Sequence, residues 1–302
     1  MRPLNSEKTY QLAEKPVPII SWEEYVAKSG VEYRDLLQHH SAEEKVFQEF
    51  FERNPAYVPG GCDLNDGSGH WPYPLALITK PALQGSFERI PDFMWLASYS
   101  ATFHPILIEI EAPAKLCFRT DNGYTQDIQH ALEQLRHWRM WMEESDHHSM
   151  FVRRFRLITG GLTGIYLAEN RFVPKYLLIY GRRKEIKSDS KKRKLREQLT
   201  DSGIQIRSYD GLTPSYKCKD CFTVRLTEQG YEAVEIMPTL QISPSTAEQY
   251  AMVAGKEQAI VRNRYLSEER KRFLVDRFKY WDEWVQNTPR EQRKIFDCSY
   301  HE

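Results

Sequence analysis

The sequence predicts an α/β fold in which a central mixed β-sheet is flanked by helices, with a helical C-terminal extension. Two apolar runs at residues 92–97 and 105–111 are separated by a short polar stretch, a pattern typical of an antiparallel hairpin. Apolar runs at 176–181 and 204–210 enclose a basic helical stretch, which indicates a strand–helix–strand crossover. Helical patterns precede the hairpin and follow the last apolar runs, so both helices and sheet contribute to the core.

The composition of the 302 residues limits the classes of protein that fit. Hydrophobic residues make up 41% and charged residues 28%, and no apolar run approaches the roughly 18 residues of a membrane helix. The first ten residues, MRPLNSEKTY, lack the apolar stretch of a secretory signal, so we expect a cytoplasmic protein without a membrane span. The net charge is zero, with 42 basic and 42 acidic residues, so any nucleic-acid contact must come from a local patch.

Three segments are expected along the chain. Residues 1–40 form an N-terminal extension with a short helix near 22–27, residues 41–237 form the main domain, and residues 238–302 form a helical extension. The main domain begins with a helix at 41–55, where apolar residues recur at helical spacing before an Asn-Pro stop.

A loop rich in Gly and Pro follows at residues 57–74 and ends near Trp71 and Tyr73; both disorder and a substrate-facing role are open for it. After the hairpin we expect a helix at about 125–144 and a strand at 155–161.

The last two strands are expected at residues 222–226 and 233–236, divided by the turn residues EQG. The tail then turns helical at 250–256 and 268–285. Its apolar side chains would be buried either on the core or against a second subunit; they are Phe273, Leu274, Phe278, Trp281 and Trp284.

The five cysteines are an odd number, which favours reduced thiols over a disulfide framework. Cys218 and Cys221 form a lone CxxC pair. A structural zinc site needs four ligands, and no second pair accompanies this one, so we prefer two ordinary loop thiols.

The second hairpin strand carries the residues that point to chemistry. Side chains alternate along a strand, so Glu109 and Glu111 lie on the same face, ~6.6–7 Å apart. Pairing Ala97 with Ile106 would also set Asp92 opposite Glu111, which adds a third carboxylate. A hard cation such as Mg²⁺ or Mn²⁺ would relieve the repulsion among these oxygens. The alternative is an edge strand whose charged face is simply solvated.

A basic segment lies between residues 182 and 196. Such density suits contacts to phosphates, although a solvated loop is the other reading. It contains nine basic residues against Glu185 and Asp189; the basic residues are Arg182, Arg183, Lys184, Lys187, Lys191, Lys192, Arg193, Lys194 and Arg196.

The hairpin resembles the metal-binding hairpin of PD-(D/E)XK nucleases. The order I-P-D-F, a spacer of 16 residues and then I-E-I-E-A-P, flanked by two helices, is similar to that family. The resemblance implies a restriction-endonuclease-like core with Asp92 and Glu109 as ligands of Mg²⁺ or Mn²⁺. Glu111 occupies the place of the family's lysine, and a carboxylate cannot supply that positive charge. Either Glu111 holds a second metal, or Lys115 reaches back from the following loop.

More of the chain resembles Shedu-type anti-phage proteins. The matching runs are EKVFQEFFERNP, ALEQLRHWRMW, Gly181-Arg182 and IQIRSYDGL, between residues 44 and 212. From the first helix the resemblance adds Glu44 to the acidic cluster. Ser41 and Glu44 also spell a capping box, which would be a purely structural role. From the second helix it adds Gln134 beside the metal; the bland alternative is a surface glutamine.

Three functions remain to be compared. The first is a metal-dependent nuclease that hydrolyses phosphodiester bonds in DNA as an anti-phage effector. The second is a catalytically degenerate module of the same fold that binds nucleic acid or a partner. A glycosidase with paired carboxylates is a poor third, because no sugar cleft lined by aromatic residues is recognisable. The resemblance also implies a homo-oligomer, for which the aromatic tail offers a contact surface.

Overall fold

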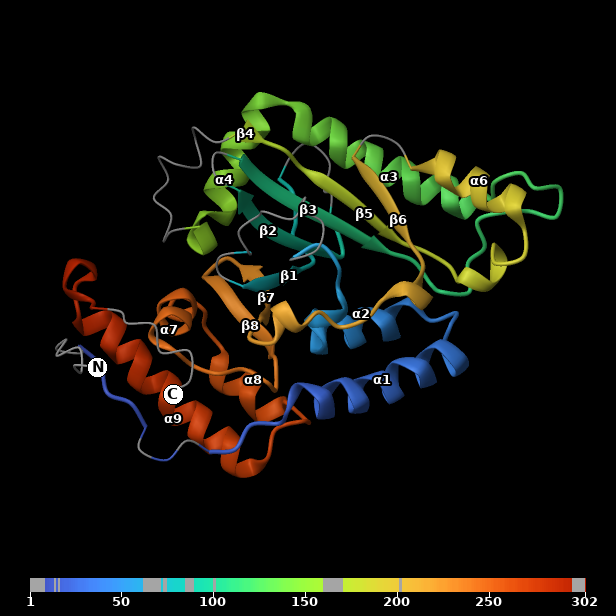
Figure 1. Ribbon diagram of the computed structural model, residues 1–302. Coiled ribbons are helices and arrows are strands. Elements are labelled where there is room, and N and C mark those ends of the chain that lie inside the picture. Colours follow the sequence, from blue (N-terminus) through green and yellow to red (C-terminus); the bar gives the residue numbers. More distant parts are fainter. Residues whose placement is uncertain are drawn as a thin grey trace, which may run out of the picture.

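The computed structural model describes residues 9–13, 15, 17–61, 72, 75–84, 90–99, 102–159, 171–200, 203–294 and 302. Within these residues the chain forms one mixed sheet of eight strands, with β4 paired beside β3 and the others in the order β6-β5-β3-β2-β1-β7-β8. The α/β class with a central mixed sheet is therefore confirmed (Figure 1). The strands are β1 Ala76–Thr79, β2 Phe93–Tyr99, β3 Thr102–Ile110, β4 Arg171–Phe172, β5 Lys175–Ile179, β6 Ile204–Arg207, β7 Phe222–Thr227 and β8 Gly230–Ile236.

Helices cover both faces of the sheet, as Figure 1 shows: α3 and α6 lie on one side, and α1 and α2 on the other. Beside β7 and β8 gather α7, α8 and α9. The helices are α1 Trp22–His39, α2 Glu44–Arg53, α3 Gln126–Glu143, α4 Ser145–Thr159, α6 Ser190–Leu199, α7 Pro244–Tyr250, α8 Lys256–Arg262 and α9 Glu268–Asn287. Single 3-10 turns occur at Pro55–Tyr57, Arg183–Glu185, Tyr209–Gly211, Tyr216–Cys218 and Arg290–Gln292.

Strand β3 lies inside the sheet and buries both faces. Ile108 and Ile110 belong to the core under α1 and α2, together with Phe47 and Phe50 of α2. Leu107 points to the opposite core, which includes Trp138 of α3. Because successive side chains alternate, the apolar run of this strand fills two cores at once. Its C-terminal end, where the apolar run gives way to carboxylates, is thereby held firmly in place.

The predicted hairpin and crossover are both confirmed. Strands β2 and β3 are antiparallel, and β5 and β6 are parallel with α6 between them. The predicted register of the hairpin is wrong by two residues, because Ala97 pairs with His104 and not with Ile106. Both strands continue through residues that read as loop, up to Tyr99 and from Thr102, so the turn is much tighter than expected.

Three local predictions are also corrected. Residues 155–159 end α4 and are not a strand, because Phe151 and Phe155 form a helical i, i+4 pair that packs in the core beside Phe172. The strand β1 was not predicted. The helix near residues 22–27 extends to His39. The loop residues 62–70 and the aromatic residues Trp71 and Tyr73 lie outside the described part of the chain.

The helical character of the tail is confirmed by α7, α8 and α9, but the helix expected at 250–256 is wrong, because residues 251–255 form the turn between α7 and α8. Leu274, Phe278 and Trp281 of α9 are buried in the same core as β7 and β8. Their burial within one chain removes the contact surface on which the oligomer prediction partly rested. Among the described residues, every helix is too short or too polar to cross a membrane.

Candidate functional site

Three carboxylates meet where the β2–β3 hairpin ends. Asp92 directly precedes β2, Glu109 lies near the end of β3, and Glu111 follows its last residue. Phe93 pairs with Ile108, so the register places Asp92 beside Glu109 and not opposite Glu111 as predicted. The Ile110 N–H donates to Asp92 Oδ2 over 2.8 Å. All three acidic residues are buried, with 4–8% of their surfaces exposed, so the hairpin brings together the acids that the sequence proposed.

Glu44 joins this group from α2. It is the first residue of the helix, the N-cap is Glu43, and no side chain caps the N-terminus, so the predicted capping box with Ser41 does not form. Glu44 is exposed as a whole residue, yet its carboxyl faces Glu111 and Asp92. Partial desolvation and the charges of these two acids raise the pKa of Glu44 to about 7. The structural alternative for Glu44 thus has no contact to support it.

The surroundings of the Glu109 carboxyl disfavour its charged form. Burial, followed by the charges of Asp92 and Glu111, raises the pKa of Glu109 to about 10. Its Oε2 atom is buried and accepts no hydrogen bond. A buried acceptor without a donor is unfavourable, so the position calls for a proton or a cation.

Two lysines partly neutralise the acids. Lys80 pairs with Asp92 Oδ1, and Lys115 pairs with Glu111 Oε2. Lys115 was anticipated from the sequence, but Lys80 was missed, because the strand β1 that it follows was not recognised. The signal was the run Ala-Leu-Ile-Thr before Lys80 and Pro81, an apolar strand that ends in a cation.

The group of acids suits a hard divalent cation by charge and by donor type. If all four carboxyls were ionised, they would carry two more negative charges than the two lysines neutralise, and carboxylate oxygens are the ligands that Mg²⁺ and Mn²⁺ prefer. In the described residues, however, no three His, Cys, Asp or Glu side chains already converge as metal ligands. Asp92 Oδ1 and Glu111 Oε2 each point at a lysine instead. Ligation would require these lysines to move aside.

Gln48 and Glu52 follow Glu44 along α2 at intervals of four residues, and both contact Thr79 of β1. Gln48 Nε2 donates to Glu52 Oε1 over 3.1 Å and to Thr79 Oγ1 over 3.0 Å, and the Thr79 hydroxyl donates to Glu52 Oε1 over 2.6 Å. These bonds tie the helix to the residue that precedes Lys80. Gln48 therefore has a positioning contact between α2 and β1.

Gln134 is half-buried in the middle of α3. The hydrogen bonds within the described segments do not join it to any of the four carboxylates. Its role beside the metal stays a prediction that rests on the resemblance. His130 and His137 are exposed on the same helix.

The basic segment divides into buried and exposed side chains. Arg182 pairs with Asp210 over 2.7 Å and donates to Leu37 O over 3.0 Å. Arg196 is buried and donates to Cys117 Sγ and Tyr180 O. These two arginines hold the fold together. Lys192 is half-buried over the Phe118 ring, and the exposed members are Arg183, Lys184, Lys187, Lys191, Arg193 and Lys194.

The same segment anchors the loop that carries Lys115. Glu185 accepts the N–H groups of Cys117 and Phe118 over 3.1 and 2.9 Å. A Cβ at Gly181 would lie 3.0 Å from Lys115 O, and Gly181 has a φ of +64°, so glycine is needed there. The basic helix α6 and the acidic hairpin are consequently linked through a single ordered loop.

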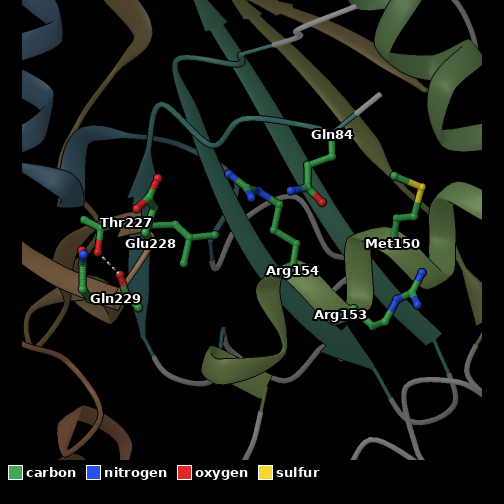
Figure 2. A pocket seen from close by; sticks show the side chains of 9 residues that line it. Gln84, Met150, Arg153, Arg154, Thr227, Glu228 and Gln229 are labelled. Carbon is green, nitrogen blue, oxygen red and sulfur yellow. Dashed lines mark hydrogen bonds between the residues drawn. The ribbon is translucent and has the colours of Figure 1, made fainter. Parts of the chain in front are cut away.

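A separate open hollow of about 560 Å³ lies between the middle of α4 and the β7–β8 turn. Figure 2 shows Arg154 beside Gln84 on one side, with Thr227, Glu228 and Gln229 on the other. None of the described carboxylates or lysines of the hairpin site lines this hollow, so it is not the candidate site. Cys218 and Cys221 are likewise elsewhere, buried before β7 and outside any disulfide.

Comparison with known families identifies the group to which the chain belongs. A family model described as "Shedu protein SduA, C-terminal" matches residues 41–213. The match spans more than half of the chain and contains α2, the hairpin, α3 and α6. A search of curated proteins gives no match. The chain therefore belongs to the Shedu family, which links it to anti-phage defence.

Proposed function

We propose that this protein is a metal-dependent nuclease that hydrolyses phosphodiester bonds in DNA as an effector of anti-phage defence. The observation that carries the proposal is the group of four acids at the end of the hairpin, with an unpartnered oxygen on Glu109. Buried carboxyls with strongly raised pKa values cluster at functional sites. Membership of the Shedu family supports the biological setting of the proposal, which is anti-phage defence.

Asp92 and Glu109 are the proposed ligands of Mg²⁺ or Mn²⁺, with Glu111 and Glu44 beside them. A divalent cation at this position supplies Lewis-acid stabilisation of the phosphate and lowers the pKa of the attacking water. The Ile110 N–H fixes Asp92 through Oδ2, and Oδ1 is left to pair with Lys80. The rigid strand β3 fixes the other ligand, so the hairpin is preorganised to hold two donor groups.

The exposed part of the basic segment is the proposed DNA contact. Arg183, Lys191, Arg193 and Lys194 are free to meet phosphates, which would orient the strand without reading its sequence. Lys192 would contribute less, because it already lies over Phe118. Arg182, also expected to bind nucleic acid, has its guanidinium engaged by Asp210. Its proposed contribution is therefore to position the segment.

The second candidate is a degenerate binding module of the same fold. One observation favours it, namely that Glu111 stands at the position of the usual lysine and is paired with Lys115. A core that had lost its catalytic cation would still bind DNA through α6 but would not cut it.

A cleavage assay separates the two candidates. Linear and circular DNA are incubated with purified protein in Mg²⁺ or Mn²⁺, with wild type, Asp92→Asn, Glu109→Gln and the exposed control Glu228→Gln compared side by side. The nuclease predicts cutting by wild type and the control, abolished by chelator and by either site variant. Intact DNA with retained binding in every metal would instead establish the degenerate module.

A further inference from the structure

The positive charge at the hairpin site needs a source other than Glu111 or Lys115. Glu111 occupies the position of the motif lysine, and Lys115 forms an ion pair with its Oε2. The Glu111–Lys115 pair has no net charge. Lys115 therefore offsets the negative charge of Glu111 but leaves no positive charge to replace that of the motif lysine. The other lysine at the site is Lys80.

Lys80 is held at the site by its backbone. Its N–H donates to Asp92 O over 2.8 Å, and the preceding Thr79 is bound to Gln48 and Glu52 of α2. Lys80 adopts a φ of +45°, which is uncommon for a residue with a long side chain, and Pro81 follows it. The chain therefore maintains an unfavourable conformation that directs this lysine at Asp92.

The side chain of Lys80 has one end in the site and one in solvent. Its Nζ pairs with Asp92 Oδ1, while 52% of the side chain is exposed against 5% for Asp92. The half-exposed Lys80 side chain can therefore contact both Asp92 and a polyanion that approaches from solvent. For Asp92 Oδ1 to ligate a cation, the Lys80 ammonium must move off it, and the half-exposed side chain can do so toward solvent.

We propose that Lys80 takes the part of the missing motif lysine: it caps Asp92 in the metal-free protein and contacts the scissile phosphate once Asp92 ligates the cation. This inference rests on the proposed nuclease function and adds a catalytic residue that directly follows β1, outside the hairpin. The contact would stabilise negative charge that develops on the phosphate, so it would act on kcat more than on KM.

The test uses Lys80→Met, Lys80→Arg and Lys28→Met. Lys28 is a matched control, because its side chain is also 52% exposed and paired with a carboxylate, Glu24, but on α1. Cleavage kinetics are measured in Mg²⁺, and Mn²⁺ affinity is measured separately by electron paramagnetic resonance without DNA. Thermal unfolding and circular dichroism check that each variant folds.

Lys80→Met is expected to lose about 10²–10³-fold in kcat with KM for DNA changed only a few-fold. The same variant is expected to bind Mn²⁺ at least as tightly as wild type, because no ammonium competes for Asp92 Oδ1. Lys80→Arg should recover part of kcat, and Lys28→Met should match wild type in both measurements.

Cutting by Lys80→Met at the wild-type rate would overturn the inference while leaving the nuclease intact. A variant that loses Mn²⁺ binding together with activity would also overturn it, since Lys80 would then merely hold Asp92 in place. A wild-type protein that binds Mn²⁺ but cuts no DNA is a different failure: it refutes the nuclease proposal, and the catalytic role of Lys80 with it.

Discussion

Four carboxyl groups and two ammonium groups share the end of the β2–β3 hairpin, and their contacts explain why the charges can coexist. Asp92 and Glu111 each face a lysine, while Glu109 has a buried oxygen without a donor. Active sites commonly keep such unfavourable groups because function requires them. The free-energy cost of burying Glu109 should therefore be measurable as a gain in stability when this side chain is replaced.

Glu109→Gln is predicted to stabilise the metal-free protein at pH 7 by about 1–3 kcal/mol, because the folded protein must keep the Glu109 carboxyl protonated at a pH at which the unfolded chain has lost that proton, whereas the amide is neutral in both states. The amide of the variant can donate to Asp92, as the protonated carboxyl can. Urea unfolding in chelator measures the difference, with Glu228→Gln as the exposed control. A variant less stable than wild type would mean that Glu109 is paired in solution by a partner that the contacts do not reveal.

A second buried acid, Glu235 of β8, provides a pH-dependent prediction away from the hairpin. Burial raises the pKa of Glu235 from 4.5 to about 7, despite the hydrogen bond from Asn263 and the nearby charges of Arg262 and Arg53. The folded protein thus keeps this proton at pH values at which the unfolded chain has lost it. Its stabilising contribution is full below pH 4.5 and is lost as the pH rises through about 7.

Glu235→Gln keeps the oxygen that accepts from Asn263 Nδ2 over 3.0 Å and from the Ile236 N–H over 3.1 Å. The variant should match wild type at about pH 4 and exceed it by about 3 kcal/mol at about pH 8. Urea unfolding at both pH values measures this gap. A gap that does not change with pH would show that Glu235 titrates normally.

Sequence reasoning reached the hairpin acids because strand alternation is a strong local pattern. It missed Lys80, since nothing near residue 80 indicates which distant strand will lie beside it. The wrong register has a similar cause: Thr102 and His104 are polar enough to read as loop, and only the tight turn beyond Tyr99 sets the pairing. Contacts between strands depend on the whole sheet, which a single segment does not encode.

At the scale of elements, α6 is the part of the basic segment best placed to meet DNA. The Asp189 carboxylate accepts the N–H groups of Lys191 and Lys192 and starts the helix. The helix then presents Lys191, Arg193 and Lys194 to solvent while Arg196 is buried. The three exposed cations therefore lie on an ordered helix, where they can meet phosphates.

Replacing Lys191 and Lys194 together with alanine is predicted to weaken DNA binding and to lower the slope of log K against log salt by about 2. The matched control replaces Arg272 and Lys279, two exposed cations of α9. Fluorescence anisotropy over a series of salt concentrations gives both slopes. Equal slopes for the two double variants would exclude α6 as the contact surface.

Local sequence patterns do not predict the end of helix α4 or strand β1. Residues 155–159 are rich in apolar side chains and read as a strand, but the aromatic pair Phe151 and Phe155 packs on one helical face. Strand β1 has only four residues, fewer than a periodic signal needs. The hairpin, α3 and the β5–α6–β6 crossover were recognised because each is long or bounded by clear turns.

At the scale of the whole molecule, the C-terminal helices are part of the core that supports the site. Trp281 is fully buried and lies 5.6 Å from the ring of Tyr10, measured between centroids. Phe278 of the same helix meets Phe222 of β7, and β7 pairs with β1. The helix is thus joined through two strands to Lys80. The division of the chain at residue 237 remains a prediction, as does the homo-oligomer.

Trp281→Ala is predicted to destabilise the protein by about 3–5 kcal/mol, because it leaves a large cavity in the core. Met140→Ala, at an exposed position of α3, should change stability by less than about 0.5 kcal/mol. Chemical unfolding measures both. A small effect of Trp281→Ala would mean that the tail is a separate unit and does not support the sheet.

A titration of metal-free protein with Mn²⁺, followed by electron paramagnetic resonance for wild type and Glu109→Gln, tests the metal site most directly. Wild type is expected to bind Mn²⁺ saturably, and the variant to lose affinity by more than about 100-fold, because a ligand is removed and not merely a neighbour of one. Equal affinity in the two proteins, or no saturable binding by wild type in the millimolar range, would contradict a metal centre at the hairpin.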